Sequence, residues 1–302
     1  MTKKHRKKKV FQIYQKEDNL KISNKRYRNE MRRFIIESLH DDAFSDITSK
    51  KIVRKKSTST AIIVSKQAGI VAGIEECTWL ANKFKLSVIP KTKDGSKINP
   101  NQIVLSITGD SRMMFKLERS ILNTLQRMSG IATYTNDIVQ LIGGKSYISA
   151  TRKTLWGGLD KKAVAIGGGL THRLGLYDGI MIKDNHIDYL GGIAELKHVH
   201  FSRRFTKIIE VRSMDELKQV ILNEIKVDSI LLDNFSPQRS TRAITWMKKN
   251  NYLKSYIIEV SGNITHDNVL KYRNTGADVL SIGALTHSAP AFNFSWRITD
   301  AA

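Results

Sequence analysis

Apolar residues recur at two different spacings along the chain, and the change in spacing divides it into two parts. In the first part, residues 29–40 have apolar positions at helical spacing, which predicts an amphipathic helix. Four short segments rich in Ile and Val, separated by Gly, Asp, Asn or Pro, predict an antiparallel sheet: 60–65, 69–73, 85–90 and 102–109. A long helix is predicted over 113–128.

In the second part, short apolar runs alternate with stretches of helical character. The runs are 147–150, 179–182, 207–211, 229–232, 256–260 and 279–282. This alternation is typical of βα units, which build a parallel sheet. By itself the pattern fits either a β/α barrel or an open, doubly wound sheet.

The apolar runs end in residues that can do chemistry. These are Arg152 and Lys153, Lys183 and Asp184, Glu210, Asp233, Ser261 and Gly262, and Gly283. The carboxyl ends of parallel strands share one edge of a sheet, and in a β/α barrel that edge is the active face. We therefore expect these residues to converge on one site.

Composition excludes several classes of protein. The 302 residues suffice for one large or two medium domains, and 41% of them are hydrophobic. The lone Cys77 excludes an intramolecular disulfide framework and is expected in the core. No apolar run approaches the roughly 20 residues that span a bilayer, and the apolar segment 10–14 is too short for a signal peptide. We expect a cytoplasmic enzyme.

The formal net charge of +22 is concentrated at the N-terminus. Residues 1–33 hold 13 Lys/Arg against 3 Asp/Glu, a net charge of +10. The segment 1–28 therefore predicts a disordered basic tail, whose deletion should leave turnover nearly intact. Such a tail either makes nonspecific contacts with nucleic-acid phosphates or only adds solubility, and the sequence leaves both interpretations open.

The densest group of candidate functional residues lies between residues 151 and 186. Two Arg, two His and two Lys stand there beside glycine triplets or at the ends of apolar runs: Arg152, Lys153, His172, Arg173, Lys183 and His186. Basic runs on polar helices are usually solvated. Basic residues at strand ends instead predict a pocket for a ligand with several negative charges.

The same region carries three motifs in a fixed order. They are Thr151-Arg152-Lys153-Thr154, then Gly167-Gly168-Gly169-Leu170-Thr171-His172-Arg173, then Ile182-Lys183-Asp184-Asn185-His186. The segment LERSILNTLQRMSGIAT stands upstream of them, and LLDNFSP, EVSGNIT and SIGALTHS stand downstream. From about Arg32 to the C-terminus, this order resembles the quinolinate phosphoribosyltransferase (nicotinate-nucleotide pyrophosphorylase) family.

The resemblance implies a fold of two α/β domains. An N-terminal α/β sandwich would consist of residues 29–135, rejoined by 285–302. A seven-stranded α/β barrel, residues 136–284, would carry the active site. The resemblance also implies a homodimer or a hexamer built from dimers.

The family's reaction joins quinolinate to phosphoribosyl pyrophosphate and releases pyrophosphate and carbon dioxide, which gives nicotinate mononucleotide for de novo NAD synthesis. Quinolinate has two adjacent carboxylates, which suit Arg and Lys partners. The resemblance assigns its pocket to Arg152, His172, Arg173 and Lys183, with Arg119 reaching in across a dimer interface. Taken alone, Arg119 also fits a solvated helix residue and His172 a structural histidine.

Two carboxylates are expected on the phosphoribosyl pyrophosphate side of the site. Glu210 and Asp233 each close a predicted strand, where they suit ribose hydroxyls, a cationic transition state and Mg²⁺, which prefers oxygen ligands and bridges phosphates. Paired carboxylates also occur in glycosidases, but the cationic cluster argues against a neutral sugar substrate. The resemblance adds Lys153, Asp184 and His287 and gives catalytic roles to Lys153, Glu210 and Asp233.

Backbone groups after the last strands are expected to hold the 5′-phosphate. Amide groups at helix N-termini bind anions, and glycine lets the backbone approach the ligand. The candidates are Ser261, Gly262, Asn263, Gly283 and Ala284, which also fit plain strand-to-helix turns. Trp156 and Arg212 depart from the family pattern and are expected at the pocket rim.

Two other functions stay open from the sequence. One is a phosphoribosyltransferase for another aromatic acid, such as the paralogue associated with molybdenum transport. The other is a nucleic-acid-binding protein on the same fold, which the charge of +22 suggests. Glu210 and Asp233 facing a cationic cluster favour the enzyme over a binding protein.

Overall fold

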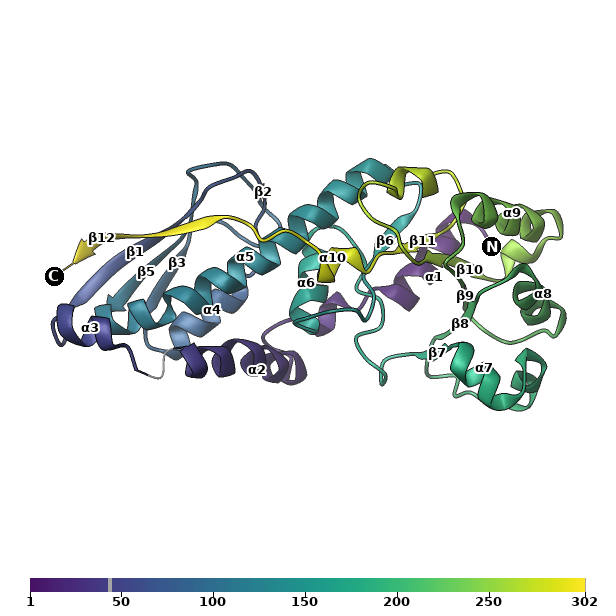
Figure 1. The fold of residues 1–302 in the computed structure, drawn as a ribbon, viewed down its shortest axis with the longest axis horizontal. Helices are drawn as coiled ribbons and strands as arrows, with labels where there is room; N and C mark the ends of the chain where they lie inside the picture. Colours follow the sequence, from purple (N-terminus) through teal and green to yellow (C-terminus); the bar gives the residue numbers. More distant parts are fainter. Residues whose placement is uncertain (43–44, 302) are drawn as a thin grey trace. The chain divides into compact units, whose positions relative to one another are not determined.

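The computed structural model describes residues 1–42 and 45–301, which form two compact units (Figure 1). The barrel unit comprises residues 1–16, 137–154 and 169–287. The sandwich unit comprises residues 17–136, 155–168 and 288–302. The division after residue 136 lies one residue from the expected boundary, and the return to the sandwich begins at residue 288 instead of 285.

The barrel unit is built on a parallel sheet. Its strands, in the order β6-β11-β10-β9-β8-β7, are β6 (Tyr147–Ser149), β7 (Ile180–Ile182), β8 (Lys207–Val211), β9 (Ser229–Asp233), β10 (Ile257–Ser261) and β11 (Val279–Ser281). Each lies within one or two residues of a predicted run. The strands are short and rich in Ile, Val and Leu because both faces of a parallel sheet are covered.

The seventh strand of the expected barrel is reduced to one residue. Leu170 forms an isolated parallel bridge with Ser149, in which Ala150 N donates to Leu170 O at 2.8 Å and Leu170 N to Ile148 O at 2.7 Å. Gly168 (φ +93°) and His172 (φ +56°) have left-handed backbones on either side of Leu170. A strand cannot continue through that conformation, so six full strands form where seven were expected.

Helices connect the strands of the barrel unit. They are α7 (Asp184–Leu190), α8 (Met214–Leu222), α9 (Pro237–Lys249) and α10 (Ala284–His287), with 3₁₀ turns at Ile193–His198, Tyr252–Lys254 and Val269–Tyr272. Serines start two of the helices: Ser213 Oγ accepts from Glu216 N at 3.1 Å, and Ser236 Oγ accepts from Arg239 N at 3.2 Å. These caps fix where each chain segment leaves the carboxyl end of its strand.

The basic N-terminal segment is a helix and not a disordered tail. Helix α1 (Lys3–Tyr14) starts at Thr2, whose hydroxyl accepts from His5 N, and its last turn buries Val10, Ile13 and Tyr14. The prediction of disorder was wrong because the low apolar content of the whole segment hides a concentrated apolar end. Three buried side chains in one turn offset the cost of ordering the helix.

Those three side chains pack inside the barrel. One apolar cluster joins them to residues from the sheet: Leu170, Ile208, Leu231, Ile257 and Val279, with Tyr147 and Met181 packed against it. All seven positions of the sheet, from Leu170 at one edge to β7 at the other, therefore contribute to a single cluster. A sheet whose two edges meet the same cluster is curled around it, and α1 fills the interior at the amino ends of the strands.

The sandwich unit has an antiparallel sheet of order β12-β1-β5-β3. Its strands are β1 (Thr58–Ser65), β3 (Ser87–Pro90), β5 (Ile103–Asp110) and β12 (Phe294–Ala301), and a small second sheet pairs β2 (Gly69–Ile70) with β4 (Lys97–Ile98). The return of the C-terminal segment to this domain is confirmed, since β12 pairs with β1 from Ser59 to Ser65. Residues 69–73 form only the two-residue strand β2.

The helices of the sandwich unit are α2 (Lys25–Asp42), α3 (Ile47–Ile52), α4 (Ile74–Lys83) and α6 (Gly158–Ile166). The long α5 (Ser111–Ile142) continues from this unit into the barrel unit and outlasts the predicted 113–128. Cys77 on α4 is buried, as predicted. Across the described residues, no helix has the length and apolarity needed to cross a membrane.

Candidate active site

A cavity of about 470 Å³ opens at the carboxyl ends of the barrel strands. Every residue lining it belongs to the barrel unit. The lining includes most of the residues predicted from the sequence: Arg152, Lys153, His172, Arg173, Lys183, Glu210, Asp233, Ser261, Gly262, Asn263, Gly283, Ala284 and His287. The predicted residues Arg119, Asp184 and His186 do not line it, and neither do Trp156 and Arg212, which were expected at its rim.

One side of the cavity is cationic. Arg173 is buried, and its guanidinium donates to Gly179 O at 2.9 Å and contacts Met181 Sδ at 3.5 Å. Burial lowers the pKa of Arg173, and the neighbouring charge of Arg152 lowers it further. Both effects show that a positive charge is held here at a cost, which an anionic ligand would remove.

Lys183 bridges the cationic side of the cavity to its carboxylates. It follows β7, and its Nζ lies 2.8 Å from Glu210 Oε2 near the end of β8. The Lys183 amide donates to His186 Nδ1 at 3.0 Å, so the His186 side chain caps the start of α7. His186 therefore has a structural contact, and Lys183 is the residue of this motif whose side chain faces the cavity.

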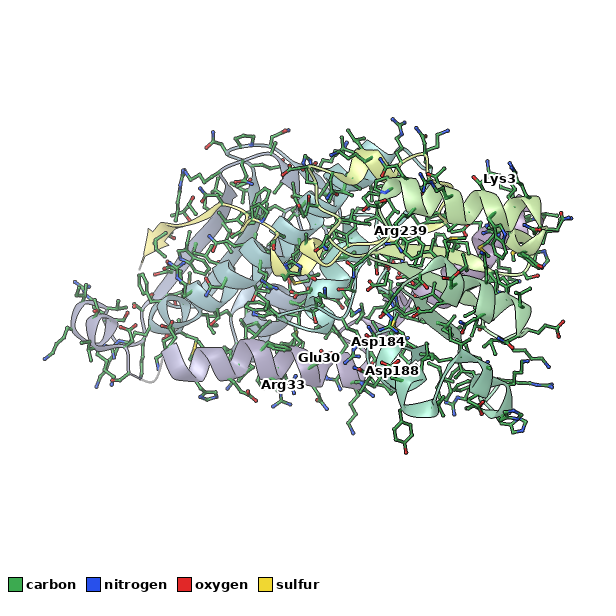
Figure 2. The ribbon with its side chains drawn as sticks, turned by 45° about the vertical axis from the view of Figure 1, so that its right-hand side comes forward. Lys3, Glu30, Arg33, Asp184, Asp188 and Arg239 are labelled. Atoms are coloured by element: carbon green, nitrogen blue, oxygen red, sulfur yellow. The ribbon has the colours of Figure 1, made fainter. Side chains whose placement is uncertain are left out.

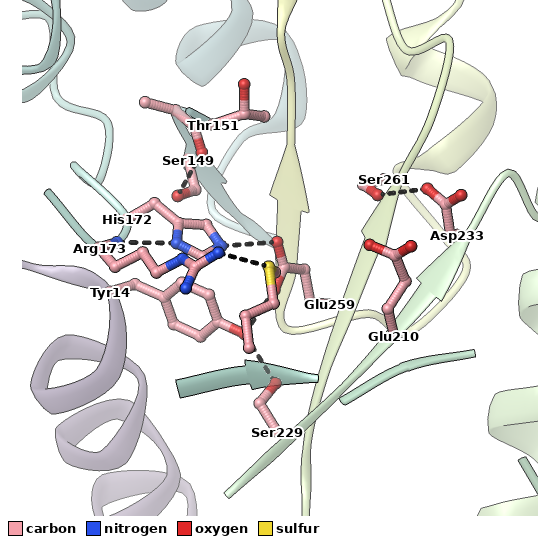
Figure 3. A network of polar contacts seen from close by, with 12 residues as sticks. Tyr14, Ser149, Thr151, His172, Arg173, Glu210, Ser229, Asp233, Glu259 and Ser261 are labelled. Atoms are coloured by element: carbon pink, nitrogen blue, oxygen red, sulfur yellow. Dashed lines mark hydrogen bonds and ion pairs between the residues drawn. The ribbon is translucent and has the colours of Figure 1, made fainter. Parts of the chain in front are cut away.

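A second network of hydrogen bonds holds Asp233 at the end of β9. Ser261 Oγ donates to Asp233 Oδ1 at 3.0 Å (Figure 3). Asn234 Nδ2 donates to Asp233 Oδ2 at 2.7 Å. Gly262 has φ +99°, and a Cβ on it would lie 2.2 Å from Asn234 Oδ1. Only glycine fits between these residues, which keeps the backbone open toward the cavity.

Lys153 and His287 approach each other over Gly283. A Cβ at Gly283 would lie 3.0 Å from His287 Nε2 and 3.3 Å from Lys153 Cδ. The hydroxyl of Thr286 donates to Lys153 O at 2.7 Å and ties the loop after β6 to α10. Two cationic or hydrogen-bonding side chains thus flank a bare stretch of backbone, an arrangement suited to phosphate oxygens.

Glu259 is the main functional residue that the sequence analysis missed. It is fully buried in the middle of β10 and lines the cavity. His172 Nε2 lies 3.2 Å from its Oε1, and the Tyr14 hydroxyl donates to its Oε2 at 2.8 Å (Figure 3). Burial by itself raises the pKa of the Glu259 carboxyl, but the charge of His172 and the hydrogen bonds from His172 and Tyr14 leave it below its usual value. Glu259 is therefore a buried carboxylate.

A signal for Glu259 was present in the sequence. Side chains on a strand alternate between its two faces, so Ile257, Glu259 and Ser261 share the face that carries the predicted site residue Ser261. His172 is held differently, in a left-handed backbone conformation with φ +56°. Such strain in a bulky residue persists only where its surroundings fix it, and it is common at functional sites.

Asp184 lies in an ion-pair cluster next to Arg212. The Arg212 guanidinium is 3.7 Å from Asp184, 3.9 Å from Asp188 and 3.0 Å from Glu216. Figure 2 shows Asp184 and Asp188 on one side of α7. Arg212 departs from the family pattern. Its guanidinium thus pairs with the Asp184 carboxylate outside the cavity lining.

Trp156 and Arg119 belong to the sandwich unit. Trp156 stacks on Phe34 with ring centroids 6.4 Å apart and lies 5.4 Å from the Arg127 guanidinium carbon. Arg119 is on α5, with its side chain exposed.

The acidic residues of the cavity can hold Mg²⁺ only if a substrate supplies further oxygen ligands. Among the described residues, no group of three or more His, Cys, Asp or Glu side chains is arranged to hold a metal ion. Glu210 and Asp233 supply carboxylate oxygens, but Lys183 already occupies one of them. This donor set fits a Mg²⁺ that arrives on the phosphates of a substrate, which is the usual way that one or two carboxylates bind it.

A cationic pocket with three carboxylates at the carboxyl ends of a parallel, curled sheet defines a β/α-barrel enzyme for polyanionic substrates. Residues 131–297 match the model of the quinolinate phosphoribosyl transferase C-terminal domain, and residues 46–129 match that of its N-terminal domain. The chain belongs to the quinolinate phosphoribosyltransferase family, the nicotinate-nucleotide pyrophosphorylases.

Relatives from distant organisms share most of the chain. A probable nicotinate-nucleotide pyrophosphorylase (carboxylating) of Methanothermobacter thermautotrophicus is 37% identical, covering 85% of this chain and 95% of its own. The enzyme of that name from Mycobacterium leprae is 33% identical, covering 83% and 91%. The structure of the Francisella tularensis nicotinate-nucleotide pyrophosphorylase superposes with a TM-score of 0.80 at 32% identity, covering 90% of this chain and 96% of that one.

Proposed function

We propose that this protein transfers the phosphoribosyl group of phosphoribosyl pyrophosphate to quinolinate and releases pyrophosphate and carbon dioxide, which yields nicotinate mononucleotide for NAD synthesis. Family membership and the cavity's combination of a cationic wall with the carboxylates of Glu210 and Asp233 support this reaction. The observation that carries it is the pair Arg152 and Arg173, whose like charges face one cavity and call for a dianionic ligand.

The cationic wall is the proposed site of the pyridine diacid. Arg152, Arg173 and Lys183 would pair with its two adjacent carboxylates, and His172 would contact the ring or a carboxylate beside them. The pyridine nitrogen itself attacks the sugar carbon, so no nucleophilic side chain is needed. The task of these residues is to hold the ring in line with the sugar.

The carboxylate side is the proposed site of the sugar. Glu210 and Asp233 would accept hydrogen bonds from the ribose hydroxyls and stabilise the positive charge that grows on the sugar as pyrophosphate leaves. Lys153 and His287 would hold phosphate oxygens, while the amides near Ser261, Gly262, Asn263, Gly283 and Ala284 bind the 5′-phosphate. Glu210 and Asp233 would hold a Mg²⁺ that arrives with the pyrophosphate, and the ion would supply positive charge to the leaving group.

Decarboxylation follows without further groups from the protein. Once its nitrogen is alkylated, the pyridinium ring carries a positive charge next to the carbon that bears the 2-carboxylate. Loss of carbon dioxide leaves an electron pair on that carbon, which the charge stabilises, and a proton then takes the vacated position. The cationic wall must therefore hold a carboxylate for the first step and let it leave as carbon dioxide in the second.

The assembled enzyme is proposed to be a cytoplasmic homodimer or a hexamer built from three dimers. Arg119 has an exposed side chain on α5, which suits a residue that completes a neighbouring subunit's pocket. In this arrangement it adds a fourth cation for the diacid. The role of Asp184 in binding phosphoribosyl pyrophosphate is indirect, since its carboxylate contacts Arg212.

The test is to incubate the purified protein with phosphoribosyl pyrophosphate, Mg²⁺ and one pyridine acid at a time. Quinolinate should be turned over with release of carbon dioxide and pyrophosphate in equal amounts. Nicotinate and nicotinamide should be poor substrates, because losing one charge-assisted contact costs about 1.5–3 kcal/mol. Nicotinate turned over as efficiently as quinolinate would contradict the proposal and favour another aromatic acid as substrate.

A further inference from the structure

Helix α1 lies outside the region that the family domain models match, which begins at residue 46. Tyr14, at the end of this helix, nevertheless reaches Glu259, which lines the cavity, from the amino ends of the strands. Tyr14 is fully buried, and its hydroxyl lies 2.8 Å from Glu259 Oε2 and 2.7 Å from Ser229 Oγ.

The direction of these hydrogen bonds follows from what each group can do. An ionised carboxylate only accepts, so the Tyr14 hydroxyl donates to Glu259. The single hydrogen of the Ser229 hydroxyl then goes either to the Tyr14 oxygen, 2.7 Å away, or to Ile257 O, 3.0 Å away. Tyr14 therefore holds one oxygen of Glu259 in place while His172 contacts the other at 3.2 Å.

The tyrosine ring also supports His172 directly. The two rings meet edge to face, with centroids 5.1 Å apart and an interplanar angle of 90°. Such contacts stabilise a pair of rings beyond their burial and restrict ring orientation. His172 is thus held by Tyr14 on one side and Glu259 on another, which helps to maintain its strained left-handed backbone.

The backbone after Tyr14 is tied to the same segment. The Thr171 hydroxyl donates to Tyr14 O at 3.1 Å and accepts from Lys16 N at 2.9 Å. Thr171 N contacts Gln15 Oε1 at 3.3 Å. Three consecutive residues at the end of α1 therefore fix the residue that precedes His172 and Arg173.

We propose that Tyr14 is a positioning residue of the active site: through Glu259 and its ring contact it sets the orientation of His172, so that the N-terminal helix is part of the machinery that binds the aromatic acid. The inference rests on the proposed function. Tyr14 does not touch substrate in this scheme, because its partners lie between it and the cavity.

Tyr14→Phe in the full chain tests the proposal, since it removes the hydroxyl but keeps the ring. Tyr147→Phe is the matched control, because Tyr147 is a half-buried tyrosine packed against the same apolar cluster. In Tyr14→Phe, KM for quinolinate should rise about tenfold while KM for phosphoribosyl pyrophosphate changes less than twofold. Tyr147→Phe should match the wild type in both.

A second measurement does not depend on turnover. The imidazole ¹⁵N resonances of His172, assigned with His172→Gln, report its tautomer and hydrogen bonding in the protein without substrates. They should shift in Tyr14→Phe and stay in place in Tyr147→Phe. If the wild type makes no product from quinolinate, the proposed function fails, while this shift still supports the role of Tyr14.

Two outcomes would overturn the positioning role. In the first, Tyr14→Phe leaves the His172 resonances and the KM for quinolinate as in the wild type. In the second, Tyr14→Phe and Tyr147→Phe weaken both substrates equally with equal falls in melting temperature. The second result would mean that α1 contributes only packing.

Discussion

The two ends of the barrel interior are made from the same strands but from opposite kinds of residue. On β10, Ile257 at the amino end lies in the apolar cluster with α1, and Ser261 at the carboxyl end lines an open cavity. Glu259 lies between them and contacts both ends. The protein fills one end with its own helix and leaves the other for ligands.

This difference between the two ends of the barrel explains how the protein offsets the cost of the charges in its site. At the carboxyl end, burial and the charge of Arg152 disfavour the charge of Arg173, and His172 has a strained backbone. Groups arranged for binding are often costly to the free protein, and the rest of the fold must offset that cost. Apolar burial at the amino end, which includes Val10, Ile13 and Tyr14, supplies part of the offset.

Removal of residues 1–16 tests how much stability the apolar end of the barrel supplies, and it has the largest expected effect. Burial of an apolar side chain contributes roughly 1.5–3 kcal/mol, so the three side chains together are worth several kcal/mol of a total stability of about 5–15 kcal/mol. We expect insoluble protein or a melting temperature lower by more than 10 °C or so. Removing only residues 2–5, which precede the buried turn, should change little. Full activity after the larger deletion would restore the prediction of a dispensable tail.

At the carboxyl end, the largest expected effect is on binding of the diacid. Lys183→Ala and Arg173→Ala should each lower kcat/KM for quinolinate roughly tenfold to a hundredfold, because each leaves a carboxylate without a charged partner. Arg212→Ala is the control, since Arg212 pairs with Asp184, Asp188 and Glu216 outside the cavity lining. Equal losses in the control and the Lys183 variant would show that general charge, not this pocket, attracts the substrate.

A third experiment tests whether a single chain supplies all the cationic side chains of its own pocket. Arg119→Ala and Lys183→Ala should each retain roughly a tenth or less of the wild-type kcat/KM when assayed alone. After random exchange of subunits between the two, half the dimers are mixed, and one pocket of each mixed dimer has both residues intact. Activity should then approach a quarter of the wild type. Exchange proven with a tagged subunit but without recovery would place Arg119 in its own chain's chemistry or in none.

The smallest effect is expected from the backbone of the phosphate loop. Gly262→Ala combines a left-handed conformation with a Cβ 2.2 Å from Asn234 Oδ1. We expect a loss of about 1–3 kcal/mol in stability and a several-fold higher KM for phosphoribosyl pyrophosphate. Gly191→Ala has the same strain, with φ +86°, but its Cβ would meet nothing within 4 Å. If both variants behave alike, strain and not crowding near Asp233 explains the glycine.

Much of the barrel could be predicted from the sequence because its signals are local. Strands β8 to β11 follow continuous apolar runs, and Glu210, Asp233 and Ser261 end or nearly end them. Strand ends point to one face in a parallel sheet, so the cavity lining follows from the strand assignments. His172 and Arg173 were found through the family's motifs.

Other features were not predictable, since they depend on distant contacts. The charge of α1 indicates a solvated tail, and its apolar turn acquires meaning only from Ile208, Leu231, Ile257 and Val279, nearly 200 residues or more away. The single-residue bridge at Leu170 depends on backbone angles at Gly168 and His172. Glu259 was hidden within an apolar run, although alternation along the strand places it beside Ser261.

The seat of α1 also bears on how the chain folds as it is made. The helix is synthesised before the barrel strands, but Arg6 pairs with Asp278, and Val10 and Ile13 share a cluster with Val279. Closing so long a loop is costly and slow, because the entropy must be lost before the contacts form. The growing chain must therefore carry its apolar turn without its partners until almost the whole barrel has emerged. The lysines that precede that turn in the sequence are expected to keep the unpaired segment soluble until its partners are made.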